Sequence, residues 1–258
     1  MLATIEARAL SSVHIQQLLD HAIYGIRIPG FVSEQSLEAA RRQLFDHPQR
    51  GALGHAREFT RLGIAYAEIK DDTVRQAYHQ AARGNIDRVR DAFRPYLSPL
   101  DDLRLRLDEA WPRGAHLLDV DGQKCFTGVT RYQEPGIDLC PHIDKLEWNL
   151  PPHLQVALQA QLSANIYLQV PAQGGELEVW NTRPSEDQYQ HLKSARHYGI
   201  DRDRLPPADF TTRPEDGDLI IINPRFIHAV RPVHHTPRIT LSSFIGYFGE
   251  QSPLIYWS

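Results

Sequence analysis

The sequence of 258 residues is poor in cysteine and in long apolar runs. It contains two cysteines, Cys125 and Cys140, which are too few for a disulfide framework and are expected to remain reduced thiols. No apolar run approaches the roughly 18 residues that a membrane-spanning helix needs. The first 19 residues also lack the basic and apolar regions of a signal peptide. These absences predict a cytoplasmic protein with no membrane partner.

An excess of basic residues is absent as well. Lysine and arginine number 28 against 32 aspartates and glutamates, which gives a formal net charge of -4. Such a balance provides no general attraction to phosphate backbones, so nucleic acid is not an expected partner. Hydrophobic residues make up 41% of the chain, enough to build a sizeable core. We expect one domain over residues 1–258, while the oligomeric state stays unknown.

The first part of the chain, residues 1–121, has helical patterns and is expected to form a helical support region with a short strand near 24–31. Helices are predicted over 34–45, 71–93 and 98–111, with Ser33 and Ser98 at the first and third N-termini. In the third helix the apolar residues are spaced by three, four and four: Leu100, Leu103, Leu107 and Trp111. Such stripes predict helices that pack on one face of the structure that follows.

From residue 122 onward the apolar period changes from helical to two. Short segments rich in β-branched and aromatic residues are separated by glycine and proline turns, and they lie at 124–133, 163–170, 175–181, 217–223, 226–233 and 238–248. Strands that follow one another without helical crossovers predict an antiparallel sandwich or jelly roll over 122–258. The fold class is therefore α+β with a mainly β core.

One long polar segment, residues 181–212, interrupts the strands. It is rich in proline and charge, and 185–199 reads as a short helix with Ser185 as its N-cap. Because this insertion lies between strands expected to line a barrel, we expect it to form part of a lid.

A histidine and an aspartate, His142 and Asp144, stand two residues apart in the strand-like stretch "GIDLCPHIDKLEW". Side chains two apart on a strand point the same way, so both can converge on one ion. A buried carboxylate is costly unless it is paired or bound to a cation. Taken alone, the pair is weak evidence, because this spacing is more typical of a solvated surface than of a metal site.

A second histidine, His228, strengthens the pattern, because Arg238 follows ten residues later and Thr240 after it. A hairpin through 234–237 is expected to place these residues on adjacent strands. Two histidines and one carboxylate leave three octahedral positions open, which suits Fe(II) that binds a chelating cosubstrate and dioxygen. Arg238 has a fork of donors matched to a carboxylate, and Thr240 lies on the same face. The layout fits a dicarboxylic cosubstrate.

The ordered set "HID", "GGELEVW", "GDLIIIN", "FIHAV" and "RIT", within residues 126–247, resembles the Fe(II)/2-oxoglutarate-dependent oxygenases. The resemblance implies a double-stranded β-helix (a cupin-like jelly roll) with Fe(II) held by His142, Asp144 and His228. It also implies that Arg238 and Thr240 hold the distal carboxylate of 2-oxoglutarate. Similarity to prolyl-hydroxylase-like members implies a cosubstrate contact for Tyr132, ten residues before His142, and a similar role for Tyr167.

The function implied by the resemblance is hydroxylation of an unactivated C–H bond in a small-molecule substrate, with Fe(II), 2-oxoglutarate and dioxygen. The helical first half and "GGELEVW" are similar in style to hydroxylases of free amino acids. The related halogenases have glycine or alanine where Asp144 stands, so halogenation is disfavoured. Three alternatives stay open: a cupin-like metal enzyme without 2-oxoglutarate, which leaves Arg238 without a task, a peptide or prolyl hydroxylase, and a jelly-roll binding module without catalysis.

Overall fold

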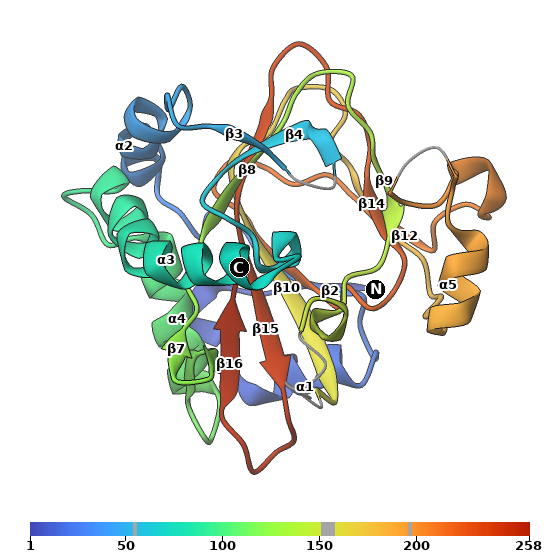
Figure 1. Ribbon diagram of the computed structural model, residues 1–258, viewed down its shortest axis with the longest axis horizontal. Coiled ribbons are helices and arrows are strands. Elements are labelled where there is room, and N and C mark those ends of the chain that lie inside the picture. The colour runs from blue at the N-terminus through green and yellow to red at the C-terminus, as the bar shows by residue number, and fades with distance from the viewer. Residues whose placement is uncertain (54–55, 151–157, 196–197) are drawn as a thin grey trace.

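The protein consists of two stacked β-sheets with helices on the outside of one of them (Figure 1). The computed structural model describes residues 1–53, 56–150, 158–195 and 198–258. Helices α2, α3 and α4 lie on one side of the molecule, and the strands of the smaller sheet lie on the other, with α5 beyond them (Figure 1). No described helix is both long and apolar enough to cross a membrane.

The larger sheet is built around four antiparallel strands in the order β13 (Leu219–Ile222), β10 (Ala160–Gln169), β15 (Arg238–Tyr247) and β8 (Val129–Gln133). Further strands extend it on both sides. Beyond β13 lie β2 (Gly25–Ile28) and β1 (Leu2–Thr4), and beyond β8 lie β4 (Ala56–Leu62) and β3 (Gly51–Leu53). Beside the end of β15 lie β16 (Leu254–Trp257) and β5 (Ala115–Leu117). A separate ribbon pairs β6 (Asp119–Val120) with β7 (Gln123–Lys124).

The smaller sheet has the order β12 (Phe210–Thr212), β11 (Leu177–Val179), β14 (His228–Val230) and β9 (Leu139–His142). From β8 to β15 the chain passes repeatedly between the two sheets, which is the topology of a double-stranded β-helix. The fold class expected from the sequence is confirmed. The expected hairpin between His228 and Arg238 is wrong, because β14 belongs to the smaller sheet and β15 to the larger one.

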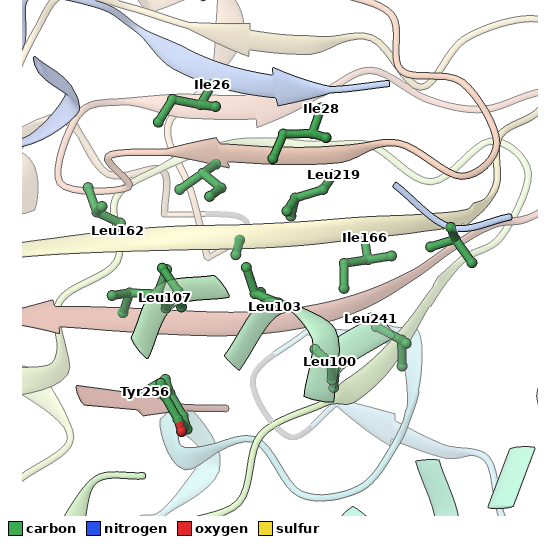
Figure 2. Packing of buried hydrophobic residues seen from close by; sticks show 14 of the residues in the cluster. Ile26, Ile28, Leu100, Leu103, Leu107, Leu162, Ile166, Leu219, Leu241 and Tyr256 are labelled. Atoms are coloured by element: carbon green, nitrogen blue, oxygen red, sulfur yellow. The ribbon is translucent and has the colours of Figure 1, made fainter. Parts of the chain in front are cut away.

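Four helices cover the outer face of the larger sheet: α1 (Ser12–Leu19), α2 (Glu34–Leu44), α3 (Asp72–Ala92) and α4 (Pro99–Ala110). Two of the predicted caps are present, since the Ser33 hydroxyl accepts from the Ser36 amide and the Ser98 hydroxyl from the Leu100 amide. The three predicted leucines of α4 pack against the sheet beside Ile166 and Leu241 (Figure 2). Packing of the N-terminal helices on one sheet is confirmed.

The first 121 residues contain more strand than expected. Besides the strand near 24–31, which is β2, they contribute β1 and the β3–β4 hairpin to the larger sheet, and β5 next to β16. β1, β3 and β5 have three residues each and are too short to show a period of two, whereas β4 has seven. They pair with the edges of the sheet, where backbone groups need partners.

The polar insertion after β11 is shorter than the predicted range of residues 181–212. Residues 210–212 form β12 of the smaller sheet, so the insertion ends at residue 209. Helix α5 (Glu186–Leu192) has the predicted Ser185 cap, but it ends before Lys193, whose backbone is extended and bridges to Ile200. Residues 196–197 of the predicted helix lie outside the described residues. In the described part of the chain, four short 3-10 helices complete the elements: η1 (Ala7–Ala9), η2 (Tyr66–Glu68), η3 (Leu146–Trp148) and η4 (Arg202–Arg204).

Candidate metal centre and adjoining cavity

His142, Asp144 and His228 lie together at the end of the smaller sheet. Strands β9 and β14 are neighbours, and His228 stands directly opposite His142. Asp144 follows the end of β9, where its backbone amide donates to the Pro224 carbonyl. One carboxylate oxygen of Asp144 lies 3.9 Å from Nε2 of His142 and 3.6 Å from Nε2 of His228. The structure thus brings together the three side chains that the sequence pointed to.

Both imidazoles are oriented in the same way by backbone carbonyls. Nδ1 of His142 donates to the Cys140 carbonyl at 2.8 Å, and Nδ1 of His228 donates to the Phe226 carbonyl at 3.1 Å. In each case the acceptor is two residues before the histidine. A hydrogen bond at Nδ1 fixes the tautomer and leaves the Nε2 lone pair for a metal. Both lone pairs therefore face the Asp144 carboxylate.

The electrostatics of the three groups favour the protonation states that bind a cation. Burial, reinforced by the neighbouring His228, lowers the pKa of His142 from 6.5 to about 4, so the imidazole is neutral near pH 7. Burial raises the pKa of Asp144, but His142 and a hydrogen bond with His228 outweigh it and hold that pKa well below its ordinary value. A neutral imidazole and an ionised carboxylate are the forms that ligate metals.

These residues fit a divalent metal ion. One ligand atom from each of the three side chains lies within 4.8 Å of the other two, and among the described residues no other group of histidine, cysteine, aspartate or glutamate does this. Two imidazoles and one carboxylate on one side of an ion are the ligand set of non-haem Fe(II) oxygenases, which keeps positions open for other ligands.

Arg238 and Thr240 lie on the inner face of β15, between the two sheets. Arg238 is 6% exposed and Thr240 is fully buried. Neither Nε of Arg238 nor the Thr240 hydroxyl has a hydrogen-bond partner within the described part of the chain. Buried donors without partners are rare in folded proteins. A carboxylate would satisfy both groups, which is the fit expected for one end of 2-oxoglutarate.

The two tyrosines with predicted cosubstrate roles have different positions. Tyr167 stands opposite Thr240 on β10, and its ring centroid lies 4.9 Å from the guanidinium carbon of Arg238. Tyr132 points to the other face of the larger sheet, where its hydroxyl donates to the Leu44 carbonyl and Arg50 covers its ring. The predicted cosubstrate contact of Tyr132 is therefore wrong, because its neighbour Arg131 occupies the inner face of β8.

Arg131 is a functional candidate that the sequence did not reveal. It pairs with Thr240 across β8 and β15 and so lies on the same inner face. Burial and, secondarily, the nearby Arg238 lower its pKa, and the Asp144 and Glu68 carboxylates offset this only in part. The alternation of residues 129–133 defines two sets of side chains, but it does not tell which set faces inward.

A cavity of about 300 Å³ adjoins the three clustered side chains. His142, Asp144 and Arg131 form part of its wall, and aromatic side chains enclose much of the remainder, including Phe59, Tyr66, Trp148, Tyr189, Tyr198, Phe244 and Trp257. Tyr198 lies edge-on to the His142 ring at 5.6 Å between centroids. Arg238, Thr240 and Tyr167 do not line this cavity.

The double-stranded β-helix, the His-Asp-His cluster and the buried arginine on the inner face of β15 are those of an Fe(II)/2-oxoglutarate-dependent oxygenase. The resemblance found in the sequence is confirmed by the comparisons with known proteins. Residues 4–258 match the family model described as "Carrier-protein-independent halogenase WelO5", and the chain belongs to that family.

Two curated relatives and one solved structure illustrate the family. The chain is 24% identical over 270 residues to L-gamma-glutamyl-L-propargylglycine hydroxylase of Streptantibioticus cattleyicolor, covering 98% of this chain and 95% of the relative. It is 26% identical over 172 residues to L-isoleucine 3(1)-dioxygenase of Pantoea ananatis, covering 60% of this chain and 56% of the relative. The crystal structure of an N-substituted L-amino acid dioxygenase from Burkholderia ambifaria has the same fold, with a TM-score of 0.65, 16% identity, and coverage of 95% of this chain and 91% of that one.

Proposed function

We propose that the protein hydroxylates an unactivated C–H bond of a free amino acid or an amino acid derivative, using Fe(II), 2-oxoglutarate and dioxygen. In this proposal His142, Asp144 and His228 hold the iron, and Arg238 and Thr240 hold the distal carboxylate of 2-oxoglutarate, with Tyr167 beside them. The observation that carries the proposal is the buried Arg238, which has no carboxylate partner among the described residues and lies on the inner face of the barrel. A cupin-like enzyme without 2-oxoglutarate would leave this cation unused.

The bound iron and 2-oxoglutarate supply the oxidising chemistry, in which 2-oxoglutarate loses carbon dioxide to become succinate and one oxygen atom enters the substrate. In this proposal the chain's own residues bind the iron, 2-oxoglutarate and the substrate, and they orient them for the reaction. The Cys140 and Phe226 carbonyls keep the two imidazoles in the tautomer that ligates metal. The aromatic side chains around the cavity exclude water from the substrate, as a reactive intermediate requires.

Hydroxylation is favoured over halogenation by Asp144. The matching family model takes its name from a halogenase. The resemblance described for the sequence implies glycine or alanine in halogenases at the position of this carboxylate. Here one oxygen of Asp144 lies within 3.9 Å of both Nε2 atoms. A carboxylate in this place takes the coordination site that a halide would need.

The substrate class rests on the relatives. Two of them are named for hydroxylation or dioxygenation of L-gamma-glutamyl-L-propargylglycine and of L-isoleucine. Both are small amino-acid compounds, and a cavity of about 300 Å³ has room for one. A peptide segment of a folded protein needs an open groove, so the peptide hydroxylase alternative is less well supported.

We further propose that residues 181–209 act as a lid over this cavity. Tyr189 of α5, Lys193 and Tyr198 belong to the cavity wall. Tyr189 also stacks on Trp148, at 5.4 Å between ring centroids and 21° between planes, which joins α5 to the segment after β9. A lid closed by this contact would keep water away from the reaction. Tyr189→Ala is expected to increase succinate formation that is not matched by hydroxylated product.

The test of the proposed function is turnover with a panel of amino acids and their derivatives under isotopically labelled dioxygen. The proposal predicts succinate release and a product that carries one labelled oxygen atom, both dependent on Fe(II) and 2-oxoglutarate. Product formation without any need for 2-oxoglutarate would favour the cupin-like alternative. A chlorinated product in the presence of chloride would contradict the role given to Asp144.

A further inference from the structure

The turn between β13 and β14 supports two of the three residues assigned to the metal. The Pro224 carbonyl accepts from the Asp144 amide at 2.9 Å, and the Phe226 carbonyl accepts from Nδ1 of His228 at 3.1 Å. Arg225 stands between these two carbonyl residues in the chain. A displacement of Arg225 would therefore move the backbone supports of both ligands.

The Arg225 side chain reaches from this turn to η3, which begins two residues after Asp144. Its Nη2 donates to Oε1 of Glu147, and the two side chains form an ion pair. The Arg225 side chain is only 7% exposed, so water screens the pair weakly. The ion pair thus joins the segment that follows Asp144 to the turn that orients His228.

The ion pair of Arg225 and Glu147 has a single contact where comparable pairs in the chain have two. In three other pairs Nε and Nη2 of the arginine both donate to the carboxylate: Arg61–Glu68, Arg90–Asp101 and Arg202–Asp138. Here Nη2 donates alone, and both Nε of Arg225 and Oε2 of Glu147 are buried without a partner within the described chain. Buried charged groups with unsatisfied atoms cost free energy. Stability alone is therefore a poor explanation of this pair.

The pair also borders the cavity beside the metal centre. Glu147 directly precedes Trp148, which belongs to the cavity wall and stacks on Tyr189 of α5. Arg225, Glu147 and Trp148 together line a second cleft, which α5 also borders. One ion pair therefore connects the aromatic wall of the cavity to the supports of the metal ligands.

We propose that Arg225 and Glu147 are positioning residues of the iron site. Their ion pair holds the supports of Asp144 and His228 in the geometry that binds iron, and it fixes Trp148 in the cavity wall. The two residues act through the backbone of the turn and of η3, without touching the metal, 2-oxoglutarate or the substrate. This inference rests on the proposed function, because the task that it assigns is at the proposed iron site.

The experiment measures the affinity for Fe(II), without dioxygen and without 2-oxoglutarate, in the wild type, Arg225→Gln and Glu147→Gln. Each variant is expected to bind Fe(II) about tenfold or more weakly, the scale seen when groups that orient metal ligands are removed. A pure charge effect has opposite signs in the two variants, because one loses a positive charge near the metal ion and the other a negative charge. A loss of affinity in both variants therefore indicates positioning.

Further variants separate positioning from a purely structural role. Arg225→Lys is expected to recover most of the Fe(II) affinity, because the observed contact uses a single nitrogen. The double variant Arg225→Gln/Glu147→Gln is expected to bind Fe(II) no more weakly than Arg225→Gln, because both changes break the same contact. The visible charge-transfer band of the Fe(II)–2-oxoglutarate complex is expected to shift in both glutamine variants, since it depends on the geometry of the ligands.

Arg90→Gln is the matched control. It also removes an arginine from an ion pair with a carboxylate, but that pair joins α3 to Asp101 of α4 in the outer layer. The control is expected to keep the Fe(II) affinity within about twofold of the wild type, with an unchanged band. Urea denaturation of each variant reports the free energy of unfolding separately from metal binding.

The inference is overturned if the two glutamine variants bind Fe(II) as tightly as the wild type, or if their affinities change in opposite directions. It is also overturned if they lose only free energy of unfolding, as a structural pair would. Should Arg225→Gln fail to fold, Glu147→Asp decides, because it keeps the charge and withdraws the carboxylate from Arg225. Lower Fe(II) affinity in that variant supports the inference, and unchanged affinity overturns it.

The proposed function is tested separately by binding of 2-oxoglutarate to the wild-type Fe(II) protein. That binding does not depend on any change to the ion pair. If the wild type binds 2-oxoglutarate and the variants keep their Fe(II) affinity, this inference alone fails. If the wild type does not bind 2-oxoglutarate, the proposed function fails, whatever the Fe(II) affinities of the variants are.

Discussion

The two faces of the larger sheet differ sharply although they belong to the same strands. On β15 the outward residues Ile239, Leu241 and Ile245 pack under the helices, while the inward residues Arg238, Thr240 and Ser242 lie between the sheets. β10 repeats the pattern, with Leu162, Ala164 and Ile166 outward and Ser163, Asn165 and Tyr167 inward. Each strand thus carries apolar packing on one face and polar chemistry on the other.

The difference separates stability from function within one sheet. Apolar area removed from water on the outer face stabilises the fold. The inner face contains buried polar groups, such as the Arg238 Nε, whose partners are not supplied within the described chain and which are therefore unfavourable until a ligand binds. Substitutions on the inner face should chiefly change binding, and substitutions on the outer face should chiefly change the free energy of unfolding.

The largest effect on function is expected from Asp144→Ala. Loss of one of the three ligands is expected to abolish hydroxylation, measured as labelled product. The variant should still fold, because the Asp144 side chain is 34% exposed. Hydroxylation at the wild-type rate would show that this carboxylate does not ligate the metal.

The largest effect on stability is expected from Ile166→Ala on the outer face of β10. Ile166 is fully buried under the helices, so truncation should lower the free energy of unfolding by about 2 to 5 kcal/mol in urea denaturation. The affinity of the folded protein for 2-oxoglutarate should not change. Leu105→Ala on α4 is the control, because Leu105 is 52% exposed and its loss should cost little. A change in the 2-oxoglutarate affinity of Ile166→Ala would contradict the claim that the outer face contributes to stability and the inner face to binding.

A smaller, pH-dependent effect is expected from a group of buried residues that packs beside β16 and includes Cys125, Tyr66 and Trp257. Burial raises the pKa of Cys125 from 9.0 to about 12 and that of Tyr66 from 10.0 to about 12. The folded state therefore keeps protons that the unfolded chain releases, and stability present below pH 9 should be lost as the pH rises towards 12. The slope is up to about 1.4 kcal/mol per pH unit for each group.

Tyr66→Phe sharpens this test. The variant removes one of the titrating groups together with a hydroxyl that has no hydrogen-bond partner in the described chain. Urea denaturation at pH 10.5 should find it less sensitive to alkali than the wild type. An identical loss of stability in both proteins would show that Tyr66 does not contribute.

The smallest effect is expected from the helix caps that hold the outer layer. Ser33→Ala should cost about 0.5 to 1 kcal/mol, because the Ser33 hydroxyl accepts from the Ser36 amide at a long distance of 3.3 Å. Ser11→Ala is the matched control, since Ser11 occupies the N-cap of α1 but its side chain makes no capping bond. Equal losses in thermal or urea denaturation would contradict the role given to the Ser33 bond.

Much of the site could be predicted from the sequence, because the metal-ligating residue types and the arginine follow one another at recognisable spacings. His142, Asp144 and His228 were found from spacing and do lie together, and Arg238 and Thr240 do share an inner face. The error at Tyr132 has a simple physical cause. Alternation separates Arg131 from Tyr132, but the choice of the inward set depends on pairing with β15, where Arg131 stands opposite Thr240.

Long-range pairing also explains what was missed in the fold. Strand β14 pairs with β9 and β11, and β15 with β8, β10 and β16, so neighbours along the chain at His228 and Arg238 are not neighbours in a sheet. The short strands β3 and β5 have no periodic signal and are defined by the sheet edges that they join. Helix α4 could be predicted without knowledge of strand pairing, because its apolar residues recur at helical spacing.

The most direct test of the central claim is the equilibrium binding of 2-oxoglutarate to the Fe(II) protein without dioxygen, in the wild type and in Arg238→Ala. The visible charge-transfer band of the iron complex reports the binding. The account predicts that the variant loses about 1.5 to 3 kcal/mol of 2-oxoglutarate binding free energy, the scale of hydrogen bonds to a charged group, while its affinity for Fe(II) is nearly unchanged. Equal 2-oxoglutarate affinity in the two proteins, or no charge-transfer band in the wild type, would contradict it.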